Sequence, residues 1–423
     1  MRLAARSVKV QKLRAFKFQL KTNSRQNTEM LKVAGCKRLV YNKALSLQIE
    51  RLGKGLKLHS YSDLCKLLTS WRHAGETIFL ADAPIHPLQQ ALRDLDRAFT
   101  NFFAGRAKFP RFKKKGRCES FRYPDPKQFK VDSANSRVFL PKLGWHRYRK
   151  SREIDGRVEQ ITISRSREHW FVSIQTEQQV DTPQTDSSST VGIDLGVKIF
   201  ATLSDGTLYT AEDAYSKYEK KIAKEQRNLS RKKMFSGKWF KQAKIIQNLH
   251  HRIFNMRRDF HHKTSTAICK NHAVVIVEDL NVKGMSASAA GTVESPGKNV
   301  RAKSGLNRAI LRQAWSAFVG QLKYKTEGFG GLLLAVPARN TSNRCSECGF
   351  VAKENRRSQS KFACIQCEHS ENADLNASRN IHAAGLAVLA SGESARVFSM
   401  KLEPTVSINT RKSFVQSESP CFS

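Results

Sequence analysis

Two pairs of cysteines near the C-terminal end of the sequence constrain its fold more than any other feature. Cys345 and Cys348 stand three positions apart, as do Cys364 and Cys367, and 15 residues separate the two pairs. Each pair offers two thiolates, and this spacing is typical of a structural zinc site. Four thiolates close a tetrahedral shell that leaves no position open for chemistry. The pattern therefore predicts a zinc ribbon that holds one Zn2+ ion for stability and not for catalysis.

The net charge indicates the class of partner. The chain of 423 residues carries 74 Lys and Arg against 36 Asp and Glu, a formal net charge of +38. So large an excess of one sign destabilises a compact protein by self-repulsion, which a bound polyanion relieves. Nucleic acid is therefore the leading partner. A basic membrane-surface protein is the alternative, but the sequence has no Lys/Arg-rich amphipathic helix with a broad apolar face to support it.

The sequence carries no pattern typical of a membrane protein or a secreted protein. No run approaches the ~18 apolar residues of a membrane span, and residues 1–12 are basic without the apolar segment of a secretory signal. The cysteines outside the two pairs are scattered along the chain, which favours a reducing cytosol. They are Cys36, Cys65, Cys118, Cys269 and Cys421.

The first half of the chain predicts strands at both ends and helices between them. In residues 15–21, Phe16, Phe18 and Leu20 alternate with polar residues, which predicts a half-buried strand. Asn23 or Ser24 is suited to cap the helix that follows. Further helical stretches occupy residues 61–71 and 87–103, and residues 131–180 predict strands. The Ser-, Thr-, Asp- and Pro-rich residues 181–190 predict a linker between two domains.

A short basic stretch in this half is a candidate nucleic-acid contact. Residues 106–117 hold seven Lys and Arg and no acid, with Phe109 and Phe112 among them. Aromatic rings among cations suit base stacking beside phosphate contacts. A solvated loop whose two phenylalanines pack on the core is the alternative. The candidate contact residues are Arg111, Lys113, Lys114 and Lys115.

The second half predicts an α/β domain. It opens on a strand that includes Asp194, and a long basic helical segment follows over residues 215–270, with apolar side chains at three- and four-residue steps. Residues 273–279 form a continuous apolar run that ends in acids, which is typical of a strand buried on both faces. Residues 373–390 predict a final helix, and the lack of any apolar period from 391 onward predicts a disordered tail.

Three acidic residues stand where a fold can gather them, namely Asp194, Glu278 and Asp374. A carboxylate in an apolar strand is costly to bury alone, so it needs a cation or a hydrogen-bond partner. Three converging carboxylates would bind two Mg2+ ions, which activate water and stabilise the leaving oxygen in phosphodiester cleavage. Each acid also has a simpler interpretation, namely a strand-end acid, a surface acid beside Asp279, and a helix N-cap that Asn372 would supply instead.

Seven short motifs give the chain a resemblance to a known family. From residue 12 to about 390 it resembles the transposon-encoded TnpB proteins, compact RNA-guided DNA endonucleases related to type V CRISPR effectors. The matching motifs are VGIDLGVK at 191–198, VIVEDLNVKG at 275–284, TSNRCSECG at 341–349 and ADLNA at 373–377, with RAFKF at 14–18, GCKRLVYN at 35–42 and FPRFK at 109–113 in the first half.

The resemblance implies a fold class of α/β plus β. It implies an N-terminal β-barrel "wedge" with a helical recognition insert, and then an RNase H-like RuvC nuclease domain that carries the zinc ribbon. The expected divisions are 1–185 for the wedge with its insert at about 23–105, 190–337 for the first part of the nuclease, 338–371 for the ribbon, 372–390 for the last nuclease helix and 391–423 for the tail.

The resemblance also implies roles for particular residues and partners. Asp194, Glu278 and Asp374 would be the catalytic ligands of two Mg2+ ions. A guide RNA from the transposon end and double-stranded target DNA would be the partners, with a protein that is monomeric on the RNA, cytoplasmic, and nucleoid-associated when bound to DNA. Base pairing would read the target, and Tyr61, His86 and Gln89 are candidates to read a short motif beside it.

Two other functions remain open from the sequence. A guided DNA-binding protein without cleavage would share the same architecture, but such a protein is expected to lose at least one acid, and all three are present. A transposase that performs strand transfer is the second, because a fold does not decide a reaction. The zinc ribbon between the second and third acidic motifs makes this the weaker alternative.

Overall fold

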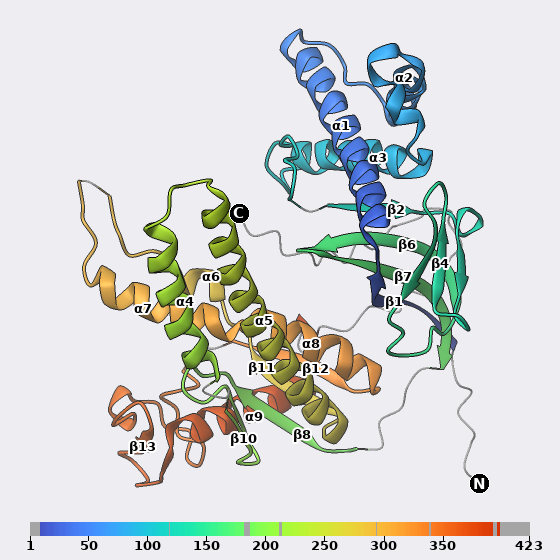
Figure 1. Cartoon of the computed structure of the whole chain (residues 1–423). Helices are drawn as coiled ribbons and strands as arrows, with labels where there is room; N and C mark the ends of the chain where they lie inside the picture. Colours follow the sequence, from blue (N-terminus) through green and yellow to red (C-terminus); the bar gives the residue numbers. More distant parts are fainter. Residues whose placement is uncertain are drawn as a thin grey trace, which may run out of the picture. The chain divides into compact units, whose positions relative to one another are not determined.

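The structure is a computed structural model that describes residues 9–117, 119–181, 187–210, 214–292, 294–337, 340–391 and 396–397. Its contacts divide the chain into two compact units, with the division between Asp181 and Thr182 (Figure 1). Residues 182–186 of the linker predicted over 181–190 lie outside the described residues. The first unit is an antiparallel sheet with three long helices, and the second is an α/β layer structure.

The sheet of the first unit has seven strands in the order β2-β6-β7-β1-β5-β4-β3, and every pair is antiparallel. The long strand β1 pairs with β7 on one side and with β5 on the other. Among the described strands the two end strands, β2 and β3, do not pair with each other, so closure into a barrel stays a prediction. The strands are β1 (Lys9–Lys21), β2 (Ser120–Tyr123), β3 (Lys130–Asp132), β4 (Arg137–Leu140), β5 (Gly144–Tyr148), β6 (Arg157–Ser166) and β7 (His169–Asp181).

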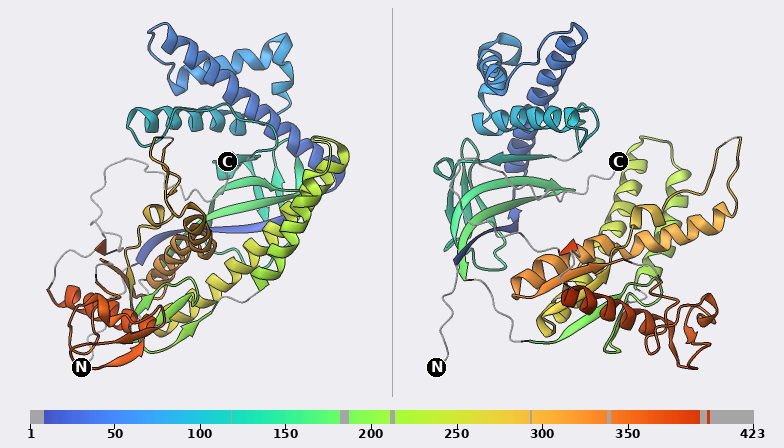
Figure 2. Two further views of the ribbon diagram at one scale, coloured as in Figure 1. Left: turned by 90° about the vertical axis from the view of Figure 1, so that its left-hand side faces the viewer. Right: turned by 180° about the vertical axis from the view of Figure 1, so that it is seen from behind.

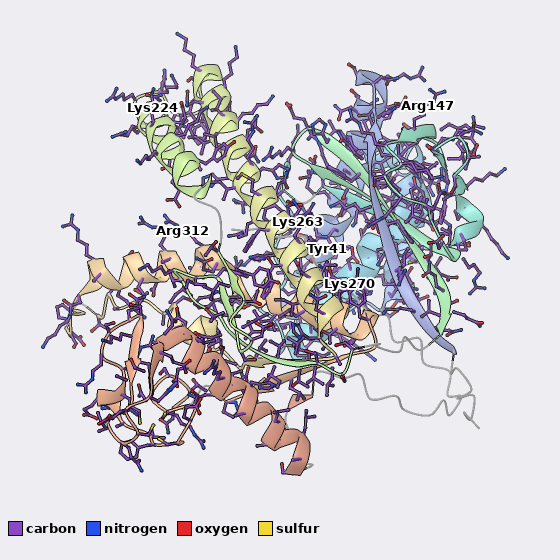
Figure 3. All side chains as sticks on the ribbon, turned by 90° about the horizontal axis from the view of Figure 1, so that it is seen from below. Tyr41, Arg147, Lys224, Lys263, Lys270 and Arg312 are labelled. Atoms are coloured by element: carbon purple, nitrogen blue, oxygen red, sulfur yellow. The ribbon has the colours of Figure 1, made fainter. Side chains whose placement is uncertain are left out.

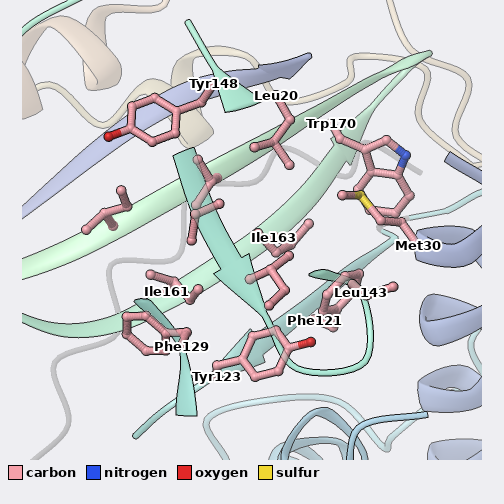
Figure 4. Close-up of a cluster of buried hydrophobic side chains, with 14 of the residues drawn as sticks. Leu20, Met30, Phe121, Tyr123, Phe129, Leu143, Tyr148, Ile161, Ile163 and Trp170 are labelled. Carbon is pink, nitrogen blue, oxygen red and sulfur yellow. The ribbon is translucent and has the colours of Figure 1, made fainter. Parts of the chain in front are cut away.

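One hydrophobic core lies against this sheet and takes side chains from all seven strands. Figure 4 shows Leu20, Tyr148, Ile161, Ile163 and Trp170 within it. The alternation predicted for the first strand is confirmed, because Phe16, Phe18 and Leu20 are buried while Lys17 and Lys21 are exposed. A strand with this period places one row of side chains in the core and the other in solvent.

Three helices between β1 and β2 form a second core of their own. They are α1 (Ser24–Gly53), α2 (Tyr61–His73) and α3 (Ile85–Phe103), with a 3-10 helix, η1 (Gly75–Ala81), between α2 and α3; a second, η2 (Pro126–Gln128), follows β2. Asn23 is the N-cap of α1, and its side chain and that of Gln26 each accept the other's backbone N–H in a capping box. Of the two caps considered from the sequence, Asn23 is therefore the one used.

The sheet of the second unit has six strands in the order β10-β9-β8-β11-β12-β15. The central strands β8, β11 and β12 are parallel, and β9, β10 and β15 are antiparallel to their neighbours. The strands are β8 (Thr190–Asp194), β9 (Ala201–Leu203), β10 (Leu208–Tyr209), β11 (Val274–Glu278), β12 (Leu332–Val336) and β15 (Arg396–Val397); a separate hairpin, β13 (Lys361–Ala363) with β14 (Ser370–Asn372), lies between the last two.

Helices cover both faces of this sheet, as Figures 1 and 2 show. Val275 and Val277 of β11 face a core shared with α5 and α8, and Ile276 faces the core beneath α9. All three are fully buried, so the predicted two-sided strand is confirmed. The helices are α4 (Ala214–Ser230), α5 (Gly237–Asn271), α6 (Val282–Met285), α7 (Val300–Gln313), α8 (Trp315–Gly328) and α9 (Ala373–Ser391), with a 3-10 turn, η3 (Lys353–Asn355).

The helix α9 lies very close to the sheet at two glycines. A Cβ on Gly192 of β8 would meet the Ser378 carbonyl oxygen at 2.4 Å, and a Cβ on Gly385 of α9 would meet the Ile276 side chain at 2.4 Å. Any side chain at either position would push the helix off the strands. Gly192, the first glycine of the VGIDLG motif, therefore allows the first turns of α9 to lie close to β8.

The end of the chain differs from the predicted tail at two residues. Arg396 and Val397 form β15, which pairs with Ala335 and Leu334 of β12. Residues 392–395 and 398–423 of that predicted tail lie outside the described residues. Among the helices that are described, none is long and apolar enough to cross a membrane.

Candidate active site

The sheet of the second unit brings Asp194 and Glu278 to the same edge. Asp194 is the last residue of β8 and Glu278 the last residue of β11. The two strands are parallel neighbours with Ile193 opposite Val277, so the residue that follows on each strand lies at adjacent positions. Both side chains are half-buried, in contrast to the fully buried apolar residues before them. Carboxyl ends of parallel strands are where α/β sheets place their ligands.

Asp374 reaches the same edge from the first turn of α9. The side chain of Asn372 accepts the backbone N–H of Asp374 at 2.9 Å and that of Leu375 at 3.3 Å. Asn372 therefore caps the helix, and the Asp374 carboxylate is left available for another role. This decides against the simpler interpretation of Asp374 as an N-cap.

One cavity of about 310 Å³ is lined by all three carboxylates. Lys198 and Arg356 also line it, and the Arg356 guanidinium lies 3.8 Å from the Asp374 carboxylate. Asp279, which follows Glu278, is exposed and lies outside the cavity lining. The structure thus brings together the three acids that the sequence singled out and separates Glu278 from its acidic neighbour.

The electrostatics of the cavity disfavour three bare charges. Burial, together with the nearby Glu278 and Asp374 carboxylates, raises the pKa of Asp194 to about 7, and Arg356 only partly offsets this. Burial also raises the pKa of Glu278, against a hydrogen bond from the Thr341 hydroxyl. Burial raises the pKa of Asp374 as well, while Arg356 and Lys198 lower it. Like charges in a partly desolvated site destabilise one another, and a cation would relieve that strain.

The donor chemistry of the cavity fits a hard divalent cation. All three side chains offer carboxylate oxygens, which Mg2+ prefers over nitrogen or sulfur. In the described part of the chain, only the four cysteines form a group of three or more metal-binding atoms within 4.8 Å of one another. The carboxylates therefore line one cavity without meeting at a single point.

The four cysteines of the two CxxC pairs do form one cluster. The sulfur of Cys345 lies 3.6 Å from that of Cys367, and Cys348 lies 3.6 Å from Cys364. A tetrahedral shell with Zn–S bonds of about 2.3 Å has sulfur–sulfur edges of about 3.8 Å. The geometry and the donor set both fit Zn2+.

Buried asparagines of α9 bind the first cysteine knuckle to the active-site helix. Asn376 accepts the backbone N–H of Ser346 at 2.9 Å and donates to the Arg344 carbonyl oxygen at 2.8 Å. Asn380 donates to the carbonyl oxygens of Arg344 and Thr341, at 2.7 and 3.0 Å. Because the Thr341 hydroxyl in turn donates to Glu278, a continuous set of hydrogen bonds joins the cysteine cluster to the carboxylates.

These supporting residues were not assigned from the sequence. Thr341 and Asn376 lie inside the TSNRC and ADLNA motifs, which was the available signal. Arg356 lies between the two CxxC pairs, in a stretch with no motif, and only the folded ribbon brings it to Asp374.

The candidate motif-reading residues lie on the helices of the first unit. Tyr61 is the first residue of α2, and the Arg93 guanidinium lies 4.8 Å from the centre of its ring. His86 and Gln89 are half-buried on the first turns of α3. Their contact with nucleic acid stays a prediction.

The basic loop is docked at one point and exposed at others. Asn42 of α1 holds the backbone of Lys113 by two hydrogen bonds, of 2.8 and 3.0 Å. Phe109 packs edge-on against Phe102 of α3 although 38% of its surface is exposed, whereas Phe112 is 51% exposed. The packing interpretation therefore applies to Phe109 and not to Phe112. The cations Arg111, Lys113, Lys114 and Lys115 are all exposed.

Basic side chains occur in both units (Figure 3). Arg147 lies on β5 of the first unit, and Lys224, Lys263, Lys270 and Arg312 lie on helices α4, α5 and α7 of the second. The +38 charge is therefore not confined to one segment.

Three family models match the chain. The model described as a probable transposase, OrfB of IS605, matches residues 173–289, and the Cas12f1-like TNB domain matches residues 315–381. Together they include all three acids and all four cysteines of the cluster. A model described as a helix-turn-helix domain matches residues 12–57. Those residues form β1 and the single helix α1, so they do not adopt a helix-turn-helix.

Known proteins match almost the whole chain. The "Putative RNA-guided DNA endonuclease InsQ" of Escherichia coli K12 is 52% identical over 397 residues, which cover 94% of this chain and 98% of that protein. A "Putative RNA-guided DNA endonuclease" of Streptomyces pristinaespiralis is 33% identical and covers 90% of this chain and 92% of its own. The structure titled as a Cas12f1-sgRNA-target DNA complex matches with a TM-score of 0.56 at 13% identity, over 88% of this chain and 99% of that one, which supports the fold. The chain therefore belongs to the TnpB family, the relatives of type V CRISPR effectors that mobile elements encode.

Proposed function

We propose that the protein is an RNA-guided DNA endonuclease of a mobile element, which cuts target DNA by Mg2+-dependent phosphodiester hydrolysis beside a short adjacent motif. The observation that carries this proposal is the gathering of Asp194, Glu278 and Asp374 in one cavity from three distant parts of the chain. The names of two relatives that match over almost their full length support the same activity.

The architecture of the second unit supports a RuvC nuclease domain with an RNase H-like fold. Five strands of its sheet lie in the order β10-β9-β8-β11-β12, which is 3-2-1-4-5 when they are numbered along the chain. Asp194 ends the first of these strands, β8, and Glu278 ends the fourth, β11. The third acid comes from the helix that packs on the first strand, and the ribbon precedes that helix. The first unit would supply the β-barrel wedge over 1–185 and the helical recognition insert, which corresponds to α1, α2 and α3.

The carboxylates of Asp194, Glu278 and Asp374 would hold two Mg2+ ions. Bound there, the ions would activate a water molecule and stabilise the leaving oxygen of the cleaved phosphodiester. The Thr341 hydroxyl orients Glu278, and Arg356 and Lys198 place positive charge at the cavity wall, where a phosphate would enter. The zinc ribbon, held on Asn376 and Asn380, fixes the position of α9 and hence of Asp374.

Recognition of the target would be divided between RNA and protein. Base pairing to a guide RNA from the transposon end would read the sequence, and the protein would hold the duplex by its backbone through Lys and Arg. Tyr61, His86 and Gln89 would read the adjacent motif, and the exposed cations of residues 106–117 would contact phosphates. The protein would act as a monomer on its RNA in the cytoplasm, associated with the nucleoid when it binds DNA.

The experiment that tests this proposal starts from the RNA that co-purifies with the full chain. The protein is expressed beside its transposon end, the bound RNA is sequenced, and the complex is incubated with Mg2+ and plasmids that carry the guide-matched target next to randomised flanking bases. We expect one defined RNA and cleavage of only those plasmids that share a short flanking motif. Binding of the target without cleavage, in Mg2+ and with several guides, would favour the guided DNA-binding protein. Joined DNA products formed by the protein alone would favour strand transfer.

A further inference from the structure

The turn between α4 and α5 carries a cluster of three aromatic rings, of which Phe235 and Phe240 are exposed and Trp239 is half-buried. The chain turns over residues 231–236, although the sequence predicts one helical segment over 215–270, and Phe235 adopts a left-handed backbone conformation with φ of 63°. The ring centres of Phe235 and Trp239 lie 5.6 Å apart, and those of Trp239 and Phe240 lie 5.2 Å apart. Figure 1 shows the two helices side by side, with this turn at the end away from the sheet. We call Phe235, Trp239 and Phe240 the hairpin tip.

The hairpin tip is not needed for the packing of its own helices. Phe235 is 69% exposed and Phe240 is 56% exposed. The hairpin has a separate core further along, made by Ile222, Ile246 and Leu249. The three rings of the tip contact one another. A phenylalanine held outward in a left-handed conformation costs stability and gains no burial, which marks a binding surface rather than a structural one.

The charges around the tip select the kind of partner. Residues 226–258 contain ten Lys and Arg and no Asp or Glu. Five of these cations immediately flank the rings, namely Arg231, Lys232, Lys233, Lys238 and Lys241. A second copy of the same tip would bring these positive charges against each other, so self-association through this surface is disfavoured.

The distribution of the cations also favours nucleic acid over a lipid surface. On α4, Lys220, Lys224 and Arg227 recur at four- and three-residue steps, so they follow one face of the helix away from the tip. A line of cations along a helix suits a chain of phosphates, and rings at its end suit bases that have left a duplex. A membrane-binding helix would instead present a long apolar face opposite its cations.

We propose that the hairpin tip is a stacking platform for unpaired bases of the bound nucleic acid, with the flanking cations in contact with the adjoining phosphates. This inference rests on the proposed function for the identity of the natural ligand, which would be an unpaired segment of the guide RNA or of the opened target. It adds a binding site to the second unit that is separate from the cavity of Asp194, Glu278 and Asp374.

The test compares full-length variants in binding a fluorescein-labelled oligouridylate of about 15 nucleotides over a series of salt concentrations. The double variant Phe235→Ala, Phe240→Ala should bind about tenfold more weakly, with the same dependence on salt, because stacking releases no counterions. The double variant Lys232→Gln, Lys233→Gln should instead reduce the slope of log affinity against log salt. Phe240→Trp should retain the parental affinity, since indole also stacks.

A matched control removes an exposed apolar side chain elsewhere in the same unit. Leu208 on β10 is 54% exposed, and Leu208→Ala should leave oligouridylate binding unchanged. Parental affinity in the aromatic double variant would overturn the stacking platform. The platform would also be overturned if the aromatic double variant kept its oligouridylate affinity but lost binding to phosphatidylserine vesicles, which would indicate a lipid surface. Loss of dimers in sedimentation at unchanged oligouridylate affinity would overturn it too, in favour of a second copy of the chain.

Guided cleavage separates failure of this inference from failure of the proposed function. If the parent cuts a guide-matched plasmid and the aromatic double variant binds oligouridylate normally, only the platform is wrong. If the parent binds no defined RNA and cuts no plasmid, the proposed function fails whatever the tip does.

Discussion

The four thiols and the three carboxylates of the second unit are both sets of metal-binding side chains, but they are arranged very differently. The cysteine sulfurs lie within 4.8 Å of one another. The carboxylates share a larger cavity, and the pKa of Asp194 is raised to about 7 by burial and by the other two acids. Repulsion from Glu278 and Asp374 is, after burial, part of the cause of that raised pKa. The two sets therefore differ in compactness, because the thiols meet around one point whereas the carboxylates line the walls of a cavity.

The two sites also differ in how far apart their residues stand along the chain. Each cysteine pair spans three positions and is shaped by a local turn. The acids stand 84 and 96 positions apart along the chain, so the parallel pairing of β8 with β11 and the docking of α9 must bring them together. Asn376 and Asn380 connect the two sites, since both bond to the backbone that leads into the first knuckle. The local site therefore helps to position the long-range one.

The largest effect should come from removing one carboxylate. We expect Asp194→Asn to slow Mg2+-dependent cleavage of guide-matched DNA by roughly a thousandfold or more, because the substitution would remove a proposed Mg2+ ligand. Guide RNA binding should be unchanged. Single-turnover cleavage and RNA-binding assays on the same preparations measure both.

The neighbour of Glu278 provides a matched control for this substitution. Asp279 is exposed and lies outside the cavity, so Asp279→Asn should cut at the parental rate. Equal loss of cleavage in both variants would mean that any negative charge near the end of β11 matters, and not the position of a carboxylate in the cavity. Parental cleavage by Asp194→Asn would end the assignment of this site.

A smaller but still large effect should follow from breaking the cysteine cluster. If the cluster holds zinc as proposed, Cys364→Ser should reduce the zinc content and lower the melting temperature, because the binding free energy of a structural metal is also folding free energy. Cleavage should fall as well, since the knuckle anchors the backbone of Thr341 and Arg344 to α9. Zinc content, thermal melting and cleavage rate test the three effects.

Cys65→Ser is the control, because Cys65 lies in the first unit and outside the cluster. It should keep the full zinc content and the parental cleavage rate. Cleavage that survives complete zinc loss in Cys364→Ser would show that the two sites are independent.

The difference between local and long-range information also explains what the sequence could predict. The CxxC pairs, the apolar run before Glu278 and the strand that includes Asp194 are short patterns with direct physical meaning, and they led to the acids and the cysteines. Arg356 and Asn380 gave no such signal, because their roles exist only when the ribbon lies on α9. The break in the basic helix was missed because Lys, Arg and Met at residues 231–234 are good helix formers, and only Ser236 as the cap of α5 marks the restart.

The melting temperature of the metal-free protein should depend on pH because of the raised pKa of Asp194. The folded-state pKa of Asp194, about 7, lies above its ordinary value of 3.8, so the folded state holds this proton more tightly than the unfolded state does. The stability that this proton gives is present below about pH 4 and is lost as the pH rises through 7. We expect the melting temperature of the parent, relative to that of Asp194→Asn, to fall over this range.

Mg2+ should reverse this effect at pH 8, where Asp194 is ionised, and should raise the melting temperature of the parent more than that of Asp194→Asn. Parallel melting curves for the two proteins at every pH would contradict the raised pKa and, with it, the view that the carboxylates repel one another before metal binds.

The smallest effect should come from Arg356, which forms an ion pair with Asp374 from the segment between the two CxxC pairs. The guanidinium lies 3.8 Å from Asp374, and both side chains are partly exposed, so their attraction is weak. Arg356 also favours the ionised forms of Asp194 and Asp374, which means that it shares the negative charge that a metal ion would use.

At pH 8, Arg356→Gln should therefore bind Mn2+, used as a spectroscopic substitute for Mg2+, about two- to fivefold more tightly. Arg357→Gln removes an exposed neighbouring charge outside the cavity lining and should bind Mn2+ as the parent does. Weaker Mn2+ binding in Arg356→Gln alone would instead mean that the guanidinium holds Asp374 in its metal-binding position, so that the ribbon organises the carboxylates through this ion pair as well as through Asn376 and Asn380.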